Sequence, residues 1–241
     1  MKKSTSHLLI EKYNTILQRA TIRDENTKTI IFRSFQRTIG QFLPADKSAR
    51  ILDIACGEGA LLTFLRERGY CHLKGFDLSD ENVSICHDLG LEFVVKFDAL
   101  ELEKFSPDEK YDTIFALDIL EHLPKEKVVE FLTKVYQLLD PGGYLIIQTP
   151  NMGALQGLFI RYNDLTHEFG LTEFSAKSLL IAAGWEKNNI SIYAAWNATT
   201  FFGYVREFYL RILHRLIFLI EGDQRPRIPT KNLLIVARKD K

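Results

Sequence analysis

The sequence predicts a single α/β domain with a doubly wound parallel sheet, and three observations lead to this prediction. Apolar runs of strand length alternate with helix-length amphipathic stretches from residue 51 onward. Glycine, proline or a capping residue marks most of the boundaries between these runs. The length of 241 residues, of which 46% are hydrophobic, suffices for one complete core. We therefore assign residues 1–241 to one domain.

Seven segments are expected to be strands because they are short, apolar and bounded by turn residues. They are Ile51–Ala55, Leu73–Asp77, Glu92–Val95, Tyr111–Leu117, Tyr144–Thr149, Ile190–Ala195 and Asn232–Arg238. Helices are expected between them at Gly59–Arg68, Asp80–Leu89, Lys125–Leu139 and Ser175–Ala183.

The segments outside this core are predicted to be helical as well. In the first fifty residues, two stretches each place their apolar residues on one helix face: Leu9, Tyr13, Ile16, Leu17 and Ala20, then Ile31, Phe35, Ile39 and Phe42. Residues 196–231 form an insertion that is too long for a hairpin loop. We divide the chain into a helical cap (1–49), a core (50–195 and 232–241) and a helical insertion (196–231). The cap and the insertion are expected to form a lid.

Composition limits the partners and the compartment. The chain has 31 basic and 31 acidic side chains, so it lacks the basic surplus of nucleic-acid-binding proteins, and we expect no nucleic-acid partner. Residues 206–241 nevertheless hold nine Lys or Arg against four Asp or Glu, a local charge of +5. Three cysteines without C-x-x-C spacing favour a reducing cytoplasm. No signal peptide is visible, and residues 208–220 are too short and too charged to span a bilayer.

The segment ILDIACGEGALL, residues 51–62, leads an apolar strand through a glycine turn into a helical pattern. Gly57 and Gly59 allow a tight turn and a close approach to a ligand at the strand end, where doubly wound sheets bind ligands. A dinucleotide-binding loop has a third glycine where Leu62 stands here. The sequence therefore predicts an adenosine ligand without a diphosphate.

Acidic residues end the next two strands. Asp77 can accept hydrogen bonds from both ribose hydroxyls, and Asp98 is well placed to receive the adenine amino group. FALDILEHLP then ends the fourth strand, and LLDPGGYLIIQTPN introduces the fifth. In this order and at these spacings, the five segments resemble the class I S-adenosylmethionine-dependent methyltransferases over about residues 50–151.

This resemblance implies a fold, a cofactor and a set of contact residues. The implied fold is a Rossmann-like sheet of seven strands in the order 3-2-1-4-5-7-6, with the last strand antiparallel. The implied cofactor is S-adenosylmethionine. The matching positions are Asp53, Ala55, Gly57 and Gly59 for the methionine part, Asp77 and Leu78 for the ribose, Asp98 and Ala99 for the adenine, and Leu117 beside the sulfonium. Asp118 is also assigned to the cofactor.

The acceptor is indicated less directly. LDILEHLP replaces the N/D-P-P-Y/F loop of many enzymes that methylate nucleobase amines, which argues against such an acceptor. A hydroxyl acceptor needs a base, and the candidates are His122 and His167, with Asp164 in the polar loop of the latter. The alternative for each histidine is a structural role in a hydrogen-bonded turn. This loop and FSAKSLLIAAGW resemble bacterial methyltransferases of surface-polysaccharide assembly, which implies a sugar hydroxyl of a glycan or its precursor.

A metal ion is kept as an alternative. Asp118-x-x-Glu121-His122, followed by His167, is similar to the E-x-x-E-H…H pattern of small-RNA terminal 2′-O-methyltransferases, and ubiquinone-biosynthesis O-methyltransferases have a related E-x-x-E-H. In those families the residues bind a divalent cation that acidifies the acceptor hydroxyl. Here Asp118 replaces the first Glu, and D-x-x-E-H also occurs in metal-free relatives. We assign no metal ligand.

The insertion carries an unusual segment, residues 201–221, that is almost continuously apolar with Arg211 and Arg215 one helical turn apart. It is interpreted as a lid, a homodimer interface, or a helix on the inner surface of the membrane. Its aromatic residues leave a phenolic or quinone-like acceptor open as the alternative to a sugar. A pocket lined by Asn163, Asp164 and His167 would suit a sugar, and a dry aromatic slot would suit a phenol. A non-catalytic scaffold is the third alternative.

Overall fold

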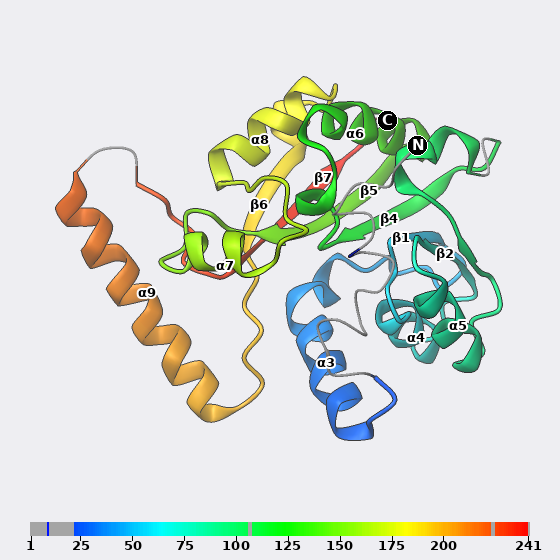
Figure 1. Ribbon diagram of the computed structural model, residues 1–241, viewed down its shortest axis with the longest axis horizontal. Helices are drawn as coiled ribbons and strands as arrows, with labels where there is room; N and C mark the ends of the chain where they lie inside the picture. Colours follow the sequence, from blue (N-terminus) through cyan, green and yellow to red (C-terminus); the bar gives the residue numbers. More distant parts are fainter. Residues whose placement is uncertain (1–8, 10–21, 106–107, 223–224, 241) are drawn as a thin grey trace.

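The computed structural model describes residues 9, 22–105, 108–222 and 225–240, which build a seven-stranded sheet covered by helices on both faces (Figure 1). The strand order is β3-β2-β1-β4-β5-β7-β6. β7 is antiparallel to β5 and to β6, and the remaining pairs are parallel. The predicted order and the antiparallel last strand are therefore confirmed. The strands are β1 (Arg50–Ile54), β2 (His72–Asp77), β3 (Val94–Lys96), β4 (Tyr111–Leu117), β5 (Leu139–Pro150), β6 (Ile190–Ala194) and β7 (Asn232–Arg238).

The predicted helices that fall within the described residues are present with small shifts of their ends, and residues 157–163 form a further helix that was not predicted. The α-helices are α3 (Glu25–Thr38), α4 (Ala60–Glu67), α5 (Asp80–Asp88), α6 (Val128–Leu138), α7 (Gly157–Asn163), α8 (Glu173–Ala182) and α9 (Phe201–Glu221). Short 3-10 helices are η1 (Gly40–Phe42), η2 (Ala99–Lys104), η3 (Leu120–His122), η4 (Lys125–Lys127) and η5 (Lys187–Asn189). The first of the two predicted N-terminal helices lies, apart from Leu9, outside the described residues.

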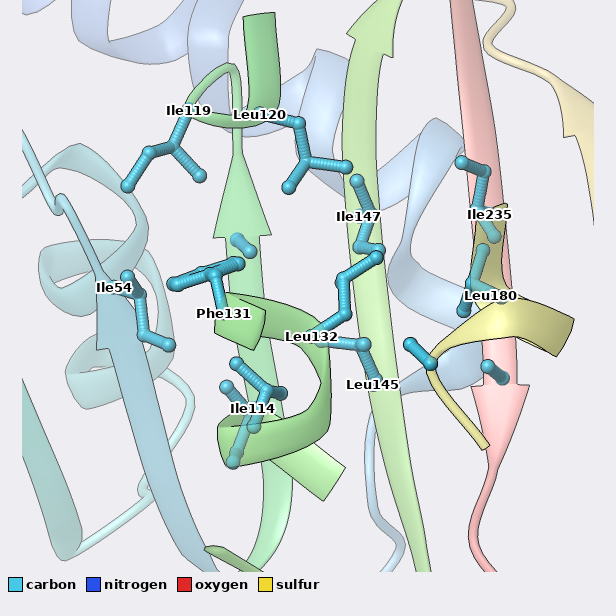
Figure 2. Packing of buried hydrophobic residues seen from close by; sticks show 14 of the residues in the cluster. Ile54, Ile114, Ile119, Leu120, Phe131, Leu132, Leu145, Ile147, Leu180 and Ile235 are labelled. Atoms are coloured by element: carbon cyan, nitrogen blue, oxygen red, sulfur yellow. The ribbon is translucent and has the colours of Figure 1, made fainter. Parts of the chain in front are cut away.

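The core has two layers because successive residues of each central strand point to opposite faces of the sheet. Leu52 and Ile114 belong to one buried cluster, whereas their neighbours Ile51 and Phe115 belong to the other. The first cluster includes residues of α6 and α8, and Figure 2 shows the packing of Phe131 against it. The second includes residues of α4 and α5, and Phe32 and Phe35 of α3 pack against it. Both faces of the strands are therefore buried, which explains their continuously apolar sequences.

Two predicted boundaries differ from the structure for local reasons. The third strand begins at Val94 instead of Glu92, because the Val94 amide donates to the Leu91 carbonyl in a turn (3.0 Å). The fifth begins at Leu139, before the predicted Pro-Gly-Gly break. Leu139 pairs with Tyr111, and the register between β4 and β5 then shifts. A β-bulge thus absorbs the residues that the sequence marks as a turn.

The predicted helix in the insertion is α9, whose N-terminus is capped by the Thr200 hydroxyl, which accepts from the Gly203 amide (3.2 Å). In Figure 1, α9 lies along the outside of the molecule, away from α4 and α5. Among the described helices, none combines the length and the apolar character needed to cross a bilayer.

Candidate functional site

The carboxyl ends of β1, β2 and β4 open into a cavity of about 430 Å³, within the size range of cofactor and small-ligand sites. Apolar residues of the N-terminal segment, Ile22, Ile31 and Phe35, line it from the other side. In the described part of the chain, α9 contributes no lining residue. The lid position predicted for both the cap and the insertion therefore belongs to α3.

The loop after β1 holds three alternate residues with positive φ angles. Ala55, Gly57 and Gly59 have φ angles of 55°, 55° and 75°. A Cβ on Gly57 would meet nothing within 4 Å, so glycine there leaves open space beside the cavity. Ala55 and Gly57 line the cavity, but Gly59 does not. A Cβ on Gly59 would lie 2.5 Å from Leu91 Cδ1, so this glycine allows α4 to pack closely instead of forming the cavity wall.

The missing third glycine of the loop is compensated on the neighbouring strand. Leu62 is fully buried, and a Cβ on Gly75 of β2 would lie 2.6 Å from its Cδ1 atom. The large side chain of α4 therefore fills the space that Gly75 leaves open. α4 therefore still packs closely on the sheet, but the small residue of the contact is Gly75 on β2 instead of a glycine on the helix.

Asp77 lies at the end of β2 and lines the cavity. Its Oδ2 atom accepts from the Gly57 amide (2.9 Å), and its Oδ1 atom accepts from the Ser79 amide and from the Asn82 side chain (2.9 Å each). Burial raises the pKa of Asp77, against these hydrogen bonds, which lower it. The carboxylate is thus held in one orientation at the cavity wall.

Asp53, two residues before Ala55, is the second buried carboxylate of the cavity. Burial, and then the negative charge of Asp77, raise its pKa well above the usual range. Two carboxylates in one buried wall favour a ligand that brings positive charge.

The remaining positions implied for the cofactor also line this cavity. They are Leu78, Asp98, Ala99, Leu117 and Asp118. Asp98 caps η2 by accepting from the Leu100 amide (2.9 Å). Asp118 has a φ of 54°, which is uncommon for a residue other than glycine, and its Oδ2 atom accepts from the side chain of Gln148 on β5 (2.9 Å).

A relay of hydrogen bonds reaches His122 at the edge of the cavity. The Thr166 hydroxyl donates to Asp164 Oδ1 (2.5 Å) and lies 2.8 Å from His122 Nδ1. Because its proton is used toward the carboxylate, the hydroxyl oxygen accepts from Nδ1–H of the imidazole. This network assigns the Nδ1–H tautomer to neutral His122, in which Nε2 is the basic nitrogen.

His167 lies behind His122 and outside the cavity lining. The two imidazole rings have centroids 4.9 Å apart, and His167 Nε2 is 3.9 Å from Asp164 Oδ2. Burial lowers the pKa of His167. Its Nδ1 atom is buried without a hydrogen-bond partner among the described residues.

Glu121 completes this cluster from the opposite side. Its side chain is buried, and its Oε2 atom accepts from the Thr149 hydroxyl (3.0 Å). Burial, and then the charge of Asp118, raise the pKa of Glu121 well above its usual range. Ligand atoms of Glu121, His122 and His167 lie within 4.8 Å of one another. Asp118, the first residue of the D-x-x-E-H motif, is not part of this group.

Three polar contributors were not singled out in the sequence. Thr166 joins Asp164 to His122, Asn82 orients Asp77, and Gln148 holds Asp118. Asn82 stands in the first turn of a predicted helix, where a side chain can face a strand end. Its position in the sequence could therefore have indicated a role at the site. The link from Thr166 to His122 and the link from Gln148 to Asp118 had no such signal, because they span 44 and 30 residues.

Comparison with known proteins decides the family. A family model described as a methyltransferase domain matches residues 26–188. The chain belongs to this methyltransferase family. The match includes α3 and every strand end that forms the cavity.

Relatives and solved structures agree with membership of the methyltransferase family. The chain is 31% identical over 113 residues to a ubiquinone biosynthesis O-methyltransferase of Paraburkholderia phytofirmans (45% of this chain, 47% of the relative). It is 32% identical over 116 residues to that of Marinobacter nauticus (46% and 48%). The chain thus spans about half the length of these curated relatives.

Among solved structures, an S-adenosylmethionine-dependent methyltransferase from Archaeoglobus fulgidus has a TM-score of 0.67 and 25% identity, covering 94% of this chain and 98% of that one. The plantazolicin methyltransferase, solved with S-adenosylhomocysteine, has a TM-score of 0.58 and 19% identity, covering 98% and 97%. Both structures therefore share the fold of this chain over nearly its whole length.

Proposed function

We propose that this methyltransferase transfers the methyl group to the hydroxyl of an apolar, phenol-like acceptor, with His122 as the base. The observation that carries the proposal is the composition of the cavity beside His122. Ile22, Ile31, Phe35 and Leu123 are among the apolar residues that line this cavity, and His122 is the histidine among its described lining residues.

For the cofactor we keep the positions that the resemblance implies and that line the cavity. We assign Asp77 to the ribose hydroxyls, Asp98 to the adenine amino group, and Asp53 with the 55–57 loop to the methionine part. The carboxylates of Asp53 and Asp77, when ionised, complement a cofactor that carries positive charge. S-adenosylmethionine, when bound, supplies an activated methyl group on a sulfonium.

The chain's own residues have three tasks in this reaction. The apolar wall binds the acceptor ring and keeps water out of the cavity. His122 Nε2 accepts the proton of the acceptor hydroxyl as its oxygen gains the methyl group. Asp164, acting through the Thr166 hydroxyl, keeps the imidazole in the required tautomer and stabilises the cation that forms, so it is a positioning residue.

A sugar hydroxyl, the acceptor favoured by the sequence, receives less support. That interpretation required Asn163, Asp164 and His167 to line the pocket, and none of the three does in the described structure. The polar loop instead faces the back of His122. The names of the curated relatives agree with a phenolic or quinone-like acceptor, the alternative left open by the sequence.

A metal-assisted version of the same reaction is the second candidate. It is favoured by the grouping of Glu121, His122 and His167 and by the buried Nδ1 atom of His167, which has no partner among the described residues. These three side chains would hold a divalent cation of the Mn²⁺, Fe²⁺, Co²⁺ or Zn²⁺ type, which would acidify the acceptor hydroxyl. Activity of the purified protein that survives exhaustive chelation contradicts this candidate.

The test is a screen of phenols and of sugars with a radiolabelled methyl donor. We expect methylation of phenols, a loss of about a hundredfold or more in His122→Ala, and unchanged affinity for S-adenosylhomocysteine. His167→Ala serves as the matched histidine control, because it retains the cavity base. Methylation confined to sugars, or full activity of His122→Ala, would contradict the proposal.

A further inference from the structure

The outward face of α9 is apolar, which is unusual for a surface helix. Phe201, Phe202 and Ile220 are 75%, 82% and 85% exposed. At 100° per residue, all the exposed apolar side chains of α9 except Tyr204 lie within an arc of about 140°. The residues in this arc are Phe201, Phe202, Val205, Phe208, Tyr209, Ile212, Leu213, Leu216, Leu219 and Ile220.

The inward face of α9 is polar, so the usual arrangement of an amphipathic helix is reversed. Glu207 is buried and accepts two hydrogen bonds from the Arg37 guanidinium (3.0 and 2.6 Å) and one from the Ala198 amide (2.8 Å). His214 is buried against the Gly153 carbonyl (Nε2 to O, 3.1 Å). These contacts fix α9 with its apolar arc toward the outside.

A second group of exposed apolar residues continues this surface. Leu158, Phe159 and Tyr162 on α7 are exposed, as is Leu165 just after it. α7 lies between α9 and the sheet in Figure 1, and the His214–Gly153 hydrogen bond connects α9 with the loop that leads into α7. An exposed apolar area of this extent indicates a binding surface.

Arginines border the arc on both sides. Arg211 and Arg215 lie along one edge and Arg206 along the other. Within residues 201–220 the only acidic residue is Glu207, which faces inward. In a two-fold contact between two copies of α9, arginines would meet arginines along both edges. The charge pattern therefore opposes self-association and complements an anionic surface.

A second cavity, of about 860 Å³, lies at the C-terminal half of α9 and has the same character. Arg215, Arg225 and Arg227 line it together with apolar side chains that include Leu216 and Leu219. The Glu173 carboxylate accepts from the Arg227 backbone amide (3.1 Å). This hydrogen bond fixes the loop through its backbone and does not involve the Arg227 guanidinium. In the described part of the chain, these three guanidiniums form no ion pair with a carboxylate.

We propose that α9 and α7 rest on an anionic phospholipid bilayer, with the apolar arc of α9 in the acyl-chain boundary and with Arg215, Arg225 and Arg227 on lipid phosphates. Three arginines beside an apolar groove match the phosphate and chains of an anionic lipid. Aromatic residues such as Phe202 and Tyr209 suit the headgroup level of a bilayer. The surface is separate from the reaction cavity, so this inference does not depend on the proposed acceptor.

The test is sedimentation of the full chain with vesicles made from equal parts of phosphatidylcholine and phosphatidylglycerol. We expect binding that is lost in phosphatidylcholine alone and weakened at about 1 M salt, where the Debye length falls to about 3 Å. One arginine near an anionic surface contributes about a fivefold factor, so Arg215→Gln/Arg225→Gln/Arg227→Gln should lower partitioning by about a hundredfold. The matched control removes three exposed cations on other elements, Lys125, Lys127 and Lys187, by substitution with Gln and should bind as the wild type does.

A second variant tests the apolar part of the surface. Phe201→Ser/Phe202→Ser should lower vesicle partitioning at least tenfold while leaving affinity for S-adenosylhomocysteine unchanged, because neither residue lines the reaction cavity. That affinity also shows that each variant is folded. Failure of the wild type to sediment with anionic vesicles overturns the inference. Sedimentation as a stable dimer that Phe201→Ser/Phe202→Ser dissociates, without vesicle binding, overturns it in favour of a second copy of the chain.

Discussion

Replacing Thr166 by Val tests the hydrogen-bond relay behind His122. Val keeps the shape of the side chain but removes the hydroxyl, which lies 2.8 Å from His122 Nδ1 and 2.5 Å from Asp164 Oδ1. Thr166 is only 2% exposed, so water does not readily replace the lost group. The imidazole then loses the partner that fixes its tautomer, and the carboxylate loses one of its donors.

The size of the effect follows from those two hydrogen bonds. A hydrogen bond to a charged group contributes about 1.5–3 kcal/mol. If this energy orients the base, kcat should fall about ten- to hundredfold in Thr166→Val, with the KM of the acceptor little changed. The free energy of unfolding should also fall, by about 1–3 kcal/mol, because buried polar groups lose their partner.

The assay is methyl transfer to a phenol, with urea unfolding measured in parallel. Thr166→Ser is the matched variant, since it retains the hydroxyl and should recover most of kcat although it also removes a buried methyl group. If Thr166 had a purely structural role, kcat in Thr166→Ser and in Thr166→Val would instead fall in proportion to the loss of unfolding free energy in each variant. Equal kcat values in Thr166→Val and the wild type would refute the relay.

Three further predictions concern the loop, the buried charge and the metal. Gly59→Ala should destabilise the fold by about 2–4 kcal/mol, because its Cβ would lie 2.5 Å from Leu91 Cδ1, whereas Gly69→Ala, at a φ of 84° in open space, should lose only about 1 kcal/mol in the same urea titration. Burial raises the pKa of Asp53 above its unfolded value, so the folded state binds this proton more tightly, and stability should fall as pH rises from about 4 toward the folded pKa. Asp53→Asn should remove that pH dependence, worth at most about 1.4 kcal/mol per pH unit, and a wild-type slope that persists in the variant would contradict this. If His167 holds a cation, chelation should abolish wild-type activity and His167→Ala should no longer respond to added Mn²⁺; equal response of both proteins would exclude that role.

The sequence predicts most of the cofactor side of the cavity because that information is local. The glycine loop and the acidic strand ends stand in a fixed order, and parallel strands bring their carboxyl ends to one edge of the sheet. It can therefore be predicted, without knowledge of tertiary contacts, that Asp53, Asp77 and Asp98 lie at one cavity, and all three line it. The family resemblance groups Gly59 with them, and only the position of Leu91 reveals its packing role.

The acceptor side could not be predicted in the same way. Whether a loop faces the cavity or the back of His122 depends on how residues 151–172 fold over β5, and no local pattern encodes that. The polar composition around Asp164 predicted a substrate pocket, whereas these groups serve the relay. The apolar residues of α9 predicted a lid by the same logic, but the buried Glu207 and His214 hold that helix with its apolar face outward.

Calorimetric titration with S-adenosylhomocysteine, comparing the wild type with Asp77→Asn, probes the cofactor site without needing the acceptor. The wild type should bind, and Asp77→Asn should bind about ten- to hundredfold more weakly, because a charged acceptor of the ribose hydroxyls is lost. Glu92→Gln, which removes an exposed carboxylate (78% exposed side chain) outside the cavity, should bind as the wild type does. No heat from the wild type, or equal affinities of the wild type and Asp77→Asn, would contradict the assignment of this cavity to the methyl donor.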